Sequence, residues 1–169
     1  MKFFSANLET LRELYHNQLR MLLSAEQQIT EALPTMIEKA TDTQLKQAFQ
    51  SHLQETHVHV TRLQQILREE TNDDESIKCK VLPALVAEAE DMMNDATDTS
   101  VRDAALIAAA QRVEHYEIAV YGAVRQWAHI LGEAEQVTIL DQTIQEEGHA
   151  DQLLTSISNR VNIEADRAA

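Results

Sequence analysis

The sequence contains few of the residues that interrupt helices or cross-link a chain. It has three glycines and two prolines in 169 residues, while alanine, leucine, glutamine and glutamate dominate. This composition favours long helices and disfavours a strand-rich fold. The single cysteine, Cys79, excludes an intramolecular disulfide, so the chain needs no oxidising compartment. The longest apolar run, 104–110, is far too short to span a bilayer. We therefore expect a soluble, cytoplasmic protein.

Positive charge and several enzyme motifs are scarce as well. Fourteen Lys and Arg residues face 28 Asp and Glu residues, which gives a formal net charge of -14. Nucleic acids and anionic membranes are polyanions that such a surface repels, so neither is an expected partner. Metal cations are the natural ligands, although surplus acid also serves solubility. A Gly-rich phosphate loop, a Cys-x-x-Cys pair and a nucleophile-elbow sequence are all missing, which removes several enzyme classes.

Apolar residues recur at spacings of three and four over most of the chain, as in amphipathic helices. The pattern predicts four long helices and one short helix, over residues 8–39, 41–70, 83–94, 101–131 and 133–161. Pro34 should kink or interrupt the first helix. Gly132 should end the helix over 101–131. With 44% hydrophobic residues, the chain 1–169 is the size of one domain, with a core over about 8–161 and a frayed tail at 162–169.

The connections between these helices predict the topology. The third and fourth long helices are joined by a tight turn, whereas the short helix lies in the longer connection between the second and the third. This order predicts an all-α fold, a four-helix bundle with a short extra crossover helix, as in ferritin-like proteins.

Acidic residues interrupt the apolar stripes from within. Glu26 lies inside the stripe of the first helix, so its side chain should point at the core. Glu55 and His59 are four residues apart, which places them about 40° apart around the helix axis and one turn along it, so both can reach one ion. The last two long helices contribute two carboxylates each. The candidate metal ligands are Glu26, Glu55, His59, Glu114, Glu117, Glu147 and Asp151.

Six carboxylates and one imidazole near the middle of four helices need compensating charge, because a buried carboxylate without a partner is costly. Two divalent metal ions would supply four positive charges; iron is the expected metal, and manganese or zinc would also fit. Each half of the chain gives one Glu and then a pair spaced by four, where di-iron bundles usually have Glu-x-x-His. Glu114 or Glu117, together with Glu26, is expected to bridge the ions.

Four further side chains near this set have open roles. His52 fits equally a residue that orients a carboxylate and a residue of the core. Glu146 and His149 form a literal Glu-x-x-His, but both fall off the inner stripe, so we expect them at the surface. Tyr121 could contact a metal centre, but an aromatic residue at helical spacing more often packs in a core.

Several segments form a specific set of motifs. They are Ser24-Ala25-Glu26, AFQSHLQE over 48–55, RDAALIAAAQRVEHYEIA over 102–119, and Glu146-Glu147 with Asp151. Together they resemble the YciE/YciF-type family of bacterial stress proteins, which are ferritin-like. The resemblance covers nearly the whole chain and implies a di-metal site at the same seven residues, frequent homodimers and a link to general or osmotic stress. It does not imply a settled activity.

Two functions therefore remain open, and the sequence does not decide whether the protein is an enzyme. In the first, a non-haem di-metal centre, expected to be di-iron, oxidises ferrous iron or reduces oxygen or peroxide species during stress. In the second, the protein is a structural or interaction protein whose metal only stabilises the fold or a dimer.

Overall fold

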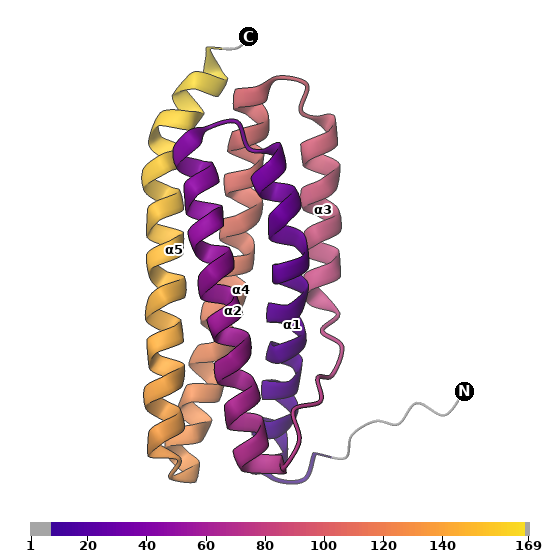
Figure 1. Ribbon diagram of the computed structural model, residues 1–169, viewed down its shortest axis with the longest axis vertical. Helices are drawn as coiled ribbons and strands as arrows, with labels where there is room; N and C mark the ends of the chain where they lie inside the picture. The colour runs from indigo at the N-terminus through magenta and orange to yellow at the C-terminus, as the bar shows by residue number, and fades with distance from the viewer. Residues whose placement is uncertain (1–7, 168–169) are drawn as a thin grey trace, which may run out of the picture.

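The computed structural model describes residues 8–167, and most of them belong to five α-helices, with no strand in this range. The helices are α1 (Leu11–Lys39), α2 (Thr43–Thr71), α3 (Val81–Asp95), α4 (Thr99–Leu131) and α5 (Ala134–Asp166) (Figure 1). Four are long and the third is short. The predicted all-α class and the order of long and short helices are confirmed.

The four long helices form a bundle in which α1 and α5 run in one direction along the long axis and α2 and α4 run in the other, so that α2 and α4 are parallel (Figure 1). α1 packs against α2, and α4 packs against α5. Residues 72–80 then run beside α1, where the Ile77 N–H donates to the Arg20 carbonyl at 3.1 Å. This connection leads into α3, which packs against α4 and α1. α3 is therefore the crossover segment, and it covers one side of the bundle.

Side-chain caps fix the helix ends close to where the sequence predicts them. Asp42 caps α2 by accepting from the Leu45 N–H, and Asp98 caps α4. Gly132 ends α4 with a φ of 86°, the left-handed conformation that glycine adopts without strain. α1 begins at Leu11 rather than Leu8, because Thr10 forms a capping box that the periodicity alone did not reveal.

α1 continues unbroken past Pro34, so the predicted alternative of an interruption is wrong. Pro34 lies on the exposed face of the helix, three residues after Glu31 and directly after the buried Leu33. The ring there removes one backbone hydrogen bond, while the buried face keeps its packing. Packing of the inner face therefore outweighs the local cost of the proline.

α5 extends to Asp166 instead of ending near Val161. Val161 is buried in the core. Arg160 contacts Asp42 at 2.6 Å and Glu164 at 3.3 Å, which ties the last turns to the start of α2 and to each other. Residues 162–166 of the predicted frayed tail are helical, and Ala168 and Ala169 lie outside the described residues.

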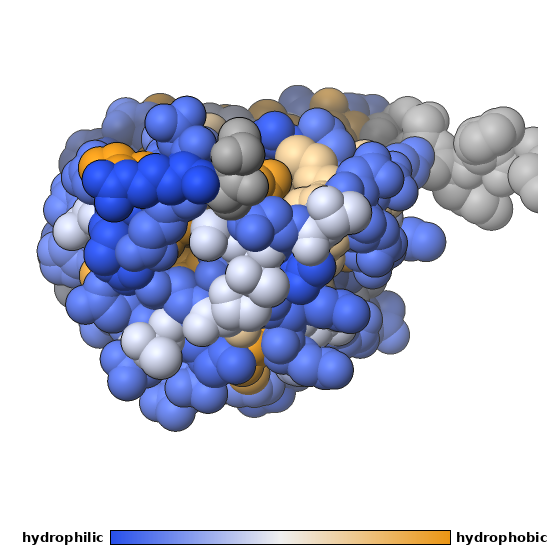
Figure 2. Space-filling view, turned by 90° about the horizontal axis from the view of Figure 1, so that it is seen from above, coloured by the Kyte–Doolittle hydropathy of each residue, from blue (hydrophilic) through white to orange (hydrophobic). Residues whose placement is uncertain are grey.

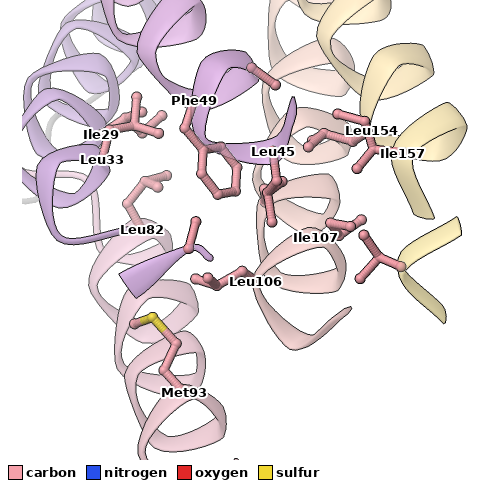
Figure 3. Close-up of a cluster of buried hydrophobic side chains, with 14 of the residues drawn as sticks. Ile29, Leu33, Leu45, Phe49, Leu82, Met93, Leu106, Ile107, Leu154 and Ile157 are labelled. Carbon is pink, nitrogen blue, oxygen red and sulfur yellow. The ribbon is translucent and has the colours of Figure 1, made fainter. Parts of the chain in front are cut away.

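The core consists of two apolar clusters. One includes Leu19, Leu63 and Tyr121. The other joins Phe49 of α2, Leu82 of α3 and further residues of all five helices (Figure 3). Along each long helix, the candidate ligands fall between residues of the two clusters. The fold thus places polar side chains in a layer between two apolar regions.

The surface differs sharply from this interior. Seen along the long axis, the end at which α1 meets α2 is mostly hydrophilic, with only small hydrophobic patches (Figure 2). Within residues 8–167, none of the helices combines the length and apolarity that crossing a bilayer requires.

Candidate metal centre

Six buried polar side chains from the four long helices fill the layer between the apolar clusters. They are Glu26 of α1, His52 and His59 of α2, Glu114 and Glu117 of α4, and Glu147 of α5. Spacings of three and seven residues within α2 and α4 keep these side chains on the inner face of each helix. Four separate helices therefore contribute carboxylates and imidazoles to one buried region.

The six side chains form two overlapping groups. One group is His52, Glu114, Glu117 and Glu147, and the other is Glu26, His59 and Glu147. In each group, the candidate ligand atoms all lie within 4.8 Å of one another. Glu147 belongs to both groups, whereas the sequence suggested that Glu114 or Glu117 would bridge with Glu26. The geometry gives the shared position to α5.

His59 lies among three carboxylates. Its Nδ1 is 3.0 Å from Glu147 Oε1 and 3.6 Å from Glu26 Oε1, and its Nε2 is 2.9 Å from Glu146 Oε2. Burial alone would lower the pKa of His59, but the carboxylates of Glu147 and Glu26 raise it to about 11. In the metal-free chain, this imidazole is the positive charge that partly balances the acids.

His52 has the opposite protonation preference. Its Nε2 is 3.3 Å from Glu114 Oε1, and its Nδ1 is 3.9 Å from Glu147 Oε2. Burial lowers the pKa of His52, despite the opposing effect of Glu147 and Glu26. The ring is therefore neutral at pH 7, and neutral imidazole is the form that binds a metal ion.

The cluster contains more carboxylates than positively charged groups. Burial and neighbouring carboxylates raise the pKa of Glu114 and Glu117 well above the ordinary value, and burial also raises the pKa of Glu26. Burial would raise the pKa of Glu147 too, but His59 beside it lowers that pKa. Protons thus replace the missing positive charge in the metal-free chain.

Hydrogen bonding in the cluster is also incomplete. Within the described residues, ten buried side-chain nitrogen and oxygen atoms lack a well-aligned hydrogen bond, and nine of them belong to the six residues of the cluster. Both ring nitrogens of His52 and both oxygens of Glu117 and of Glu147 are among them. Buried polar atoms are normally satisfied, and each exception requires an explanation. Cations bound in the two groups would explain all nine at once.

The donor set fits two divalent cations. Four carboxylates carry four negative charges, two divalent ions carry four positive charges, and the two histidines can bind while neutral. Oxygen and imidazole donors suit iron, manganese and zinc. The Tyr121 hydroxyl donates to Glu26 Oε1, so this buried tyrosine orients a carboxylate in addition to packing.

Glu146 supports the cluster from outside, which the sequence did not predict. It is only half-buried, yet it contacts His59 Nε2 and accepts hydrogen bonds from both terminal nitrogens of Arg62. Partial burial opposes the effect, but the hydrogen bonds from Arg62 lower the pKa of Glu146 to about 2. The prediction of a surface residue was wrong because the long side chain reaches inward from the rim. His149 is exposed.

The family described as "Domain of unknown function (DUF892)" matches residues 10–166, a span that contains the whole cluster. The chain belongs to the DUF892 family. Protein YciF of Escherichia coli K12 is 38% identical over 165 residues, which cover 96% of this chain and 99% of that protein. The resemblance to YciE/YciF-type proteins is confirmed.

Solved structures agree with this assignment to DUF892. The crystal structure of the E. coli stress protein YciF has a TM-score of 0.86 and 37% identity, covering 91% of this chain and 98% of that one. YcfI from Rhodopseudomonas palustris has a TM-score of 0.87 and 40% identity, covering 90% and 98%. A protein from Xanthomonas campestris, at 19% identity and a TM-score of 0.75 over 94% and 98%, supports the fold alone.

In this DUF892 chain, five of the seven predicted ligands lie together in the cluster, and two lie outside it. Glu55 is at the rim, with a side chain 44% exposed and 3.9 Å from His52 Nδ1. Asp151 is half-buried and accepts from Gln111 Nε2 at 3.0 Å. Both stay predicted ligands that neither group includes. His52 is the added member, and its position seven residues before His59 is the sequence signal for it.

Proposed function

We propose that this chain is a ferritin-like dinuclear metal protein of the bacterial stress response, with iron as the favoured metal. The supporting observation is the convergence of buried atoms without hydrogen-bond partners on Glu147, which both groups share. Such a cluster is costly in a folded protein unless cations occupy it. The stability of the metal-free protein therefore gives no reason to keep it.

The two groups divide the ligands between two ions. His52, Glu114 and Glu117 would hold one ion, Glu26 and His59 would hold the other, and Glu147 would contact both. Each ion then receives one imidazole and at least two carboxylates, as is typical of di-iron bundles. Arg62 and Glu146 fix the His59 ring from its other nitrogen, which is the usual way to orient a metal-binding histidine.

Bound there, two iron ions would supply redox chemistry toward ferrous iron, oxygen or peroxide. The chain's own contribution is to bury the ligands, since all six side chains of the cluster have little or no exposed surface. It also holds protons: in the metal-free state these lie on His59, Glu114 and Glu117. Metal uptake displaces them, so the loaded site is balanced in charge.

The link to stress comes from the relatives. The E. coli YciF structure is described as that of a stress protein, and it covers 91% of this chain at 37% identity. We extend that role to this chain as part of the proposal. We also propose a cytoplasmic protein, since the one cysteine is a free, buried thiol, and a homodimer, which sedimentation at several concentrations tests.

A structural role is the second candidate, and one observation favours it. The ligand set comes from α1, α2, α4 and α5, so a bound metal pair would tie all four long helices together. Metal binding to the folded state alone raises stability by mass action. In this case the protein would bind metal without turning over any substrate.

An activity assay separates the two candidates. Wild-type protein is loaded with ferrous iron without oxygen, and then ferrous oxidation and peroxide consumption are measured against Glu114→Ala. Glu135→Ala, an exposed change on α5, is the matched control. Redox function requires activity in the wild type and the control, and its loss in Glu114→Ala. Bound metal with no activity above that of Glu114→Ala would refute the redox function and leave the structural role.

A further inference from the structure

A cavity of about 480 Å³ lies beside the metal centre, with walls from all five helices. Its size is within the usual range for sites that bind small organic molecules. Exposed residues on its edge, such as Leu153 and Glu31, show that it opens to the surface.

Apolar side chains form most of the wall. Ile29, Phe49, Leu82, Met93 and Leu154 line the cavity and also belong to one of the apolar clusters (Figure 3). A wall of this kind offers dispersion contacts and the release of water to an apolar molecule. It offers little to a sugar or another highly polar molecule.

The inner end of the cavity reaches the metal centre. His52 and Glu114 line the cavity and belong to the group that would hold one ion. Both are buried, and neither His52 ring nitrogen nor Glu114 Oε2 has a well-aligned hydrogen bond. A molecule filling the cavity would therefore lie against one of the proposed metal positions.

The charged residues that line the cavity have one sign. Glu31, Glu55, Glu90 and Glu114 are among them, and no Lys or Arg is. An anionic ligand, such as a fatty-acid carboxylate, would find no Lys or Arg to pair with inside the cavity and would pass the carboxylates of Glu31, Glu55 and Glu90 at its rim. An uncharged molecule avoids this cost and keeps the apolar contacts.

We propose that the cavity binds a small, uncharged apolar molecule in contact with the His52–Glu114 end of the metal centre. As a substrate site, this inference rests on the function proposed above and names the substrate class. As a binding site, it rests only on the cavity, its wall and its charge. The two are therefore tested separately.

The binding test uses two probes with the same aromatic framework. N-phenyl-1-naphthylamine is uncharged, and 8-anilinonaphthalene-1-sulfonate carries a sulfonate on that framework. Fluorescence titration of metal-free protein should give at least about tenfold tighter binding of the uncharged probe, because the charged probe must either bury its sulfonate without a positive partner or hold it beside the carboxylates at the rim. Equal binding of both probes, or no binding of the uncharged one, overturns the proposal.

Variants then place the probe in this cavity. Ala110→Phe and Ala32→Phe fill it from α4 and α1, and Ala108→Phe is the matched change on the exposed face of α4. Each filling variant should weaken the uncharged probe by at least about tenfold, while the control binds like the wild type. Ala32 is only half-buried, so its variant decides the result if Ala110→Phe fails to fold. Unchanged binding in a folded filling variant contradicts the proposal.

Contact with the metal centre is measured by NMR relaxation of the bound uncharged probe. Its protons should relax faster in manganese-loaded protein than in zinc-loaded protein, and equal rates would show that the probe binds elsewhere. The two proposals also fail in different ways. Metal binding without probe binding refutes this inference alone, and probe binding without metal binding refutes the proposed function alone.

Discussion

Replacing Glu117 by methionine should change stability in opposite directions with and without metal. Glu117 is fully buried, and neither of its carboxylate oxygens has a hydrogen-bond partner. Methionine has a similar length and no polar atom that needs a partner. Relieving one unsatisfied buried group should stabilise the metal-free protein by about 1–3 kcal/mol. For a chain of this size, that raises the melting temperature by roughly 2–4 °C per kcal/mol.

Metal reverses the order. A site filled at one hundred times its dissociation constant gains about 2.7 kcal/mol of stability. The wild type should gain this, whereas Glu117→Met has lost one ligand of the group that contains His52 and gains less. Thermal unfolding followed by circular dichroism in EDTA and in excess Mn²⁺ gives both values for both proteins.

Glu38→Met is the matched control, since Glu38 is exposed on α1. It should follow the wild type in both conditions. Two results would refute the reasoning. One is a Glu117→Met protein that is less stable than the wild type in EDTA, which would mean that the carboxylate has partners. The other is a wild type whose melting temperature does not respond to metal.

Three further predictions concern the support of the fold and of the site. Asp103 accepts hydrogen bonds from two backbone N–H groups and a hydroxyl at the start of α2. Asp103→Ala should therefore lower the free energy of unfolding, measured in urea, by about 2–4 kcal/mol. A decrease of less than about 1 kcal/mol would contradict this. Arg20 lowers the pKa of Asp73 to about 2, below the unfolded value of about 3.9. The pair therefore stabilises the fold above about pH 4, and this stabilisation is lost as the pH falls toward about 2. The urea midpoints of wild type and Asp73→Asn should converge as the pH is lowered through this range. A difference between the midpoints that does not change with pH would show that the charge is not responsible. Arg62→Gln should release Glu146 from its orienting role and weaken metal binding by about 10–100-fold in a competitive titration, and unchanged affinity would remove that role.

The helices were predictable because long, uninterrupted stripes determine them. With few glycines and prolines, the spacing of apolar residues and the caps at Asp42, Asp98 and Gly132 indicate each element to within a few residues. The ends were less certain. The start of α1 depends on a capping box at Thr10, and the end of α5 depends on contacts of Arg160 with a distant loop. Only the first of these could have been read locally.

The candidate site was predictable in its centre and not at its edge. Periodicity assigns a direction to each Cβ atom, and it correctly points Glu26, Glu117 and Glu147 inward. It does not account for the reach of a side chain. Glu146 therefore contacts His59 from a position off the stripe, while Asp151, with its shorter side chain, pairs with α4 instead. Neighbours on other helices decide these cases.

The most direct test of the central claim is the number of metal ions bound per chain. Anaerobic titration of metal-free protein with Fe²⁺, checked by elemental analysis after gel filtration, should give two equivalents for the wild type. Glu147→Ala should lose both, because Glu147 belongs to both groups, whereas Glu135→Ala, an exposed change on the same helix, should keep both. A wild type that retains no metal, or a Glu147→Ala protein that still binds two ions, would contradict the account.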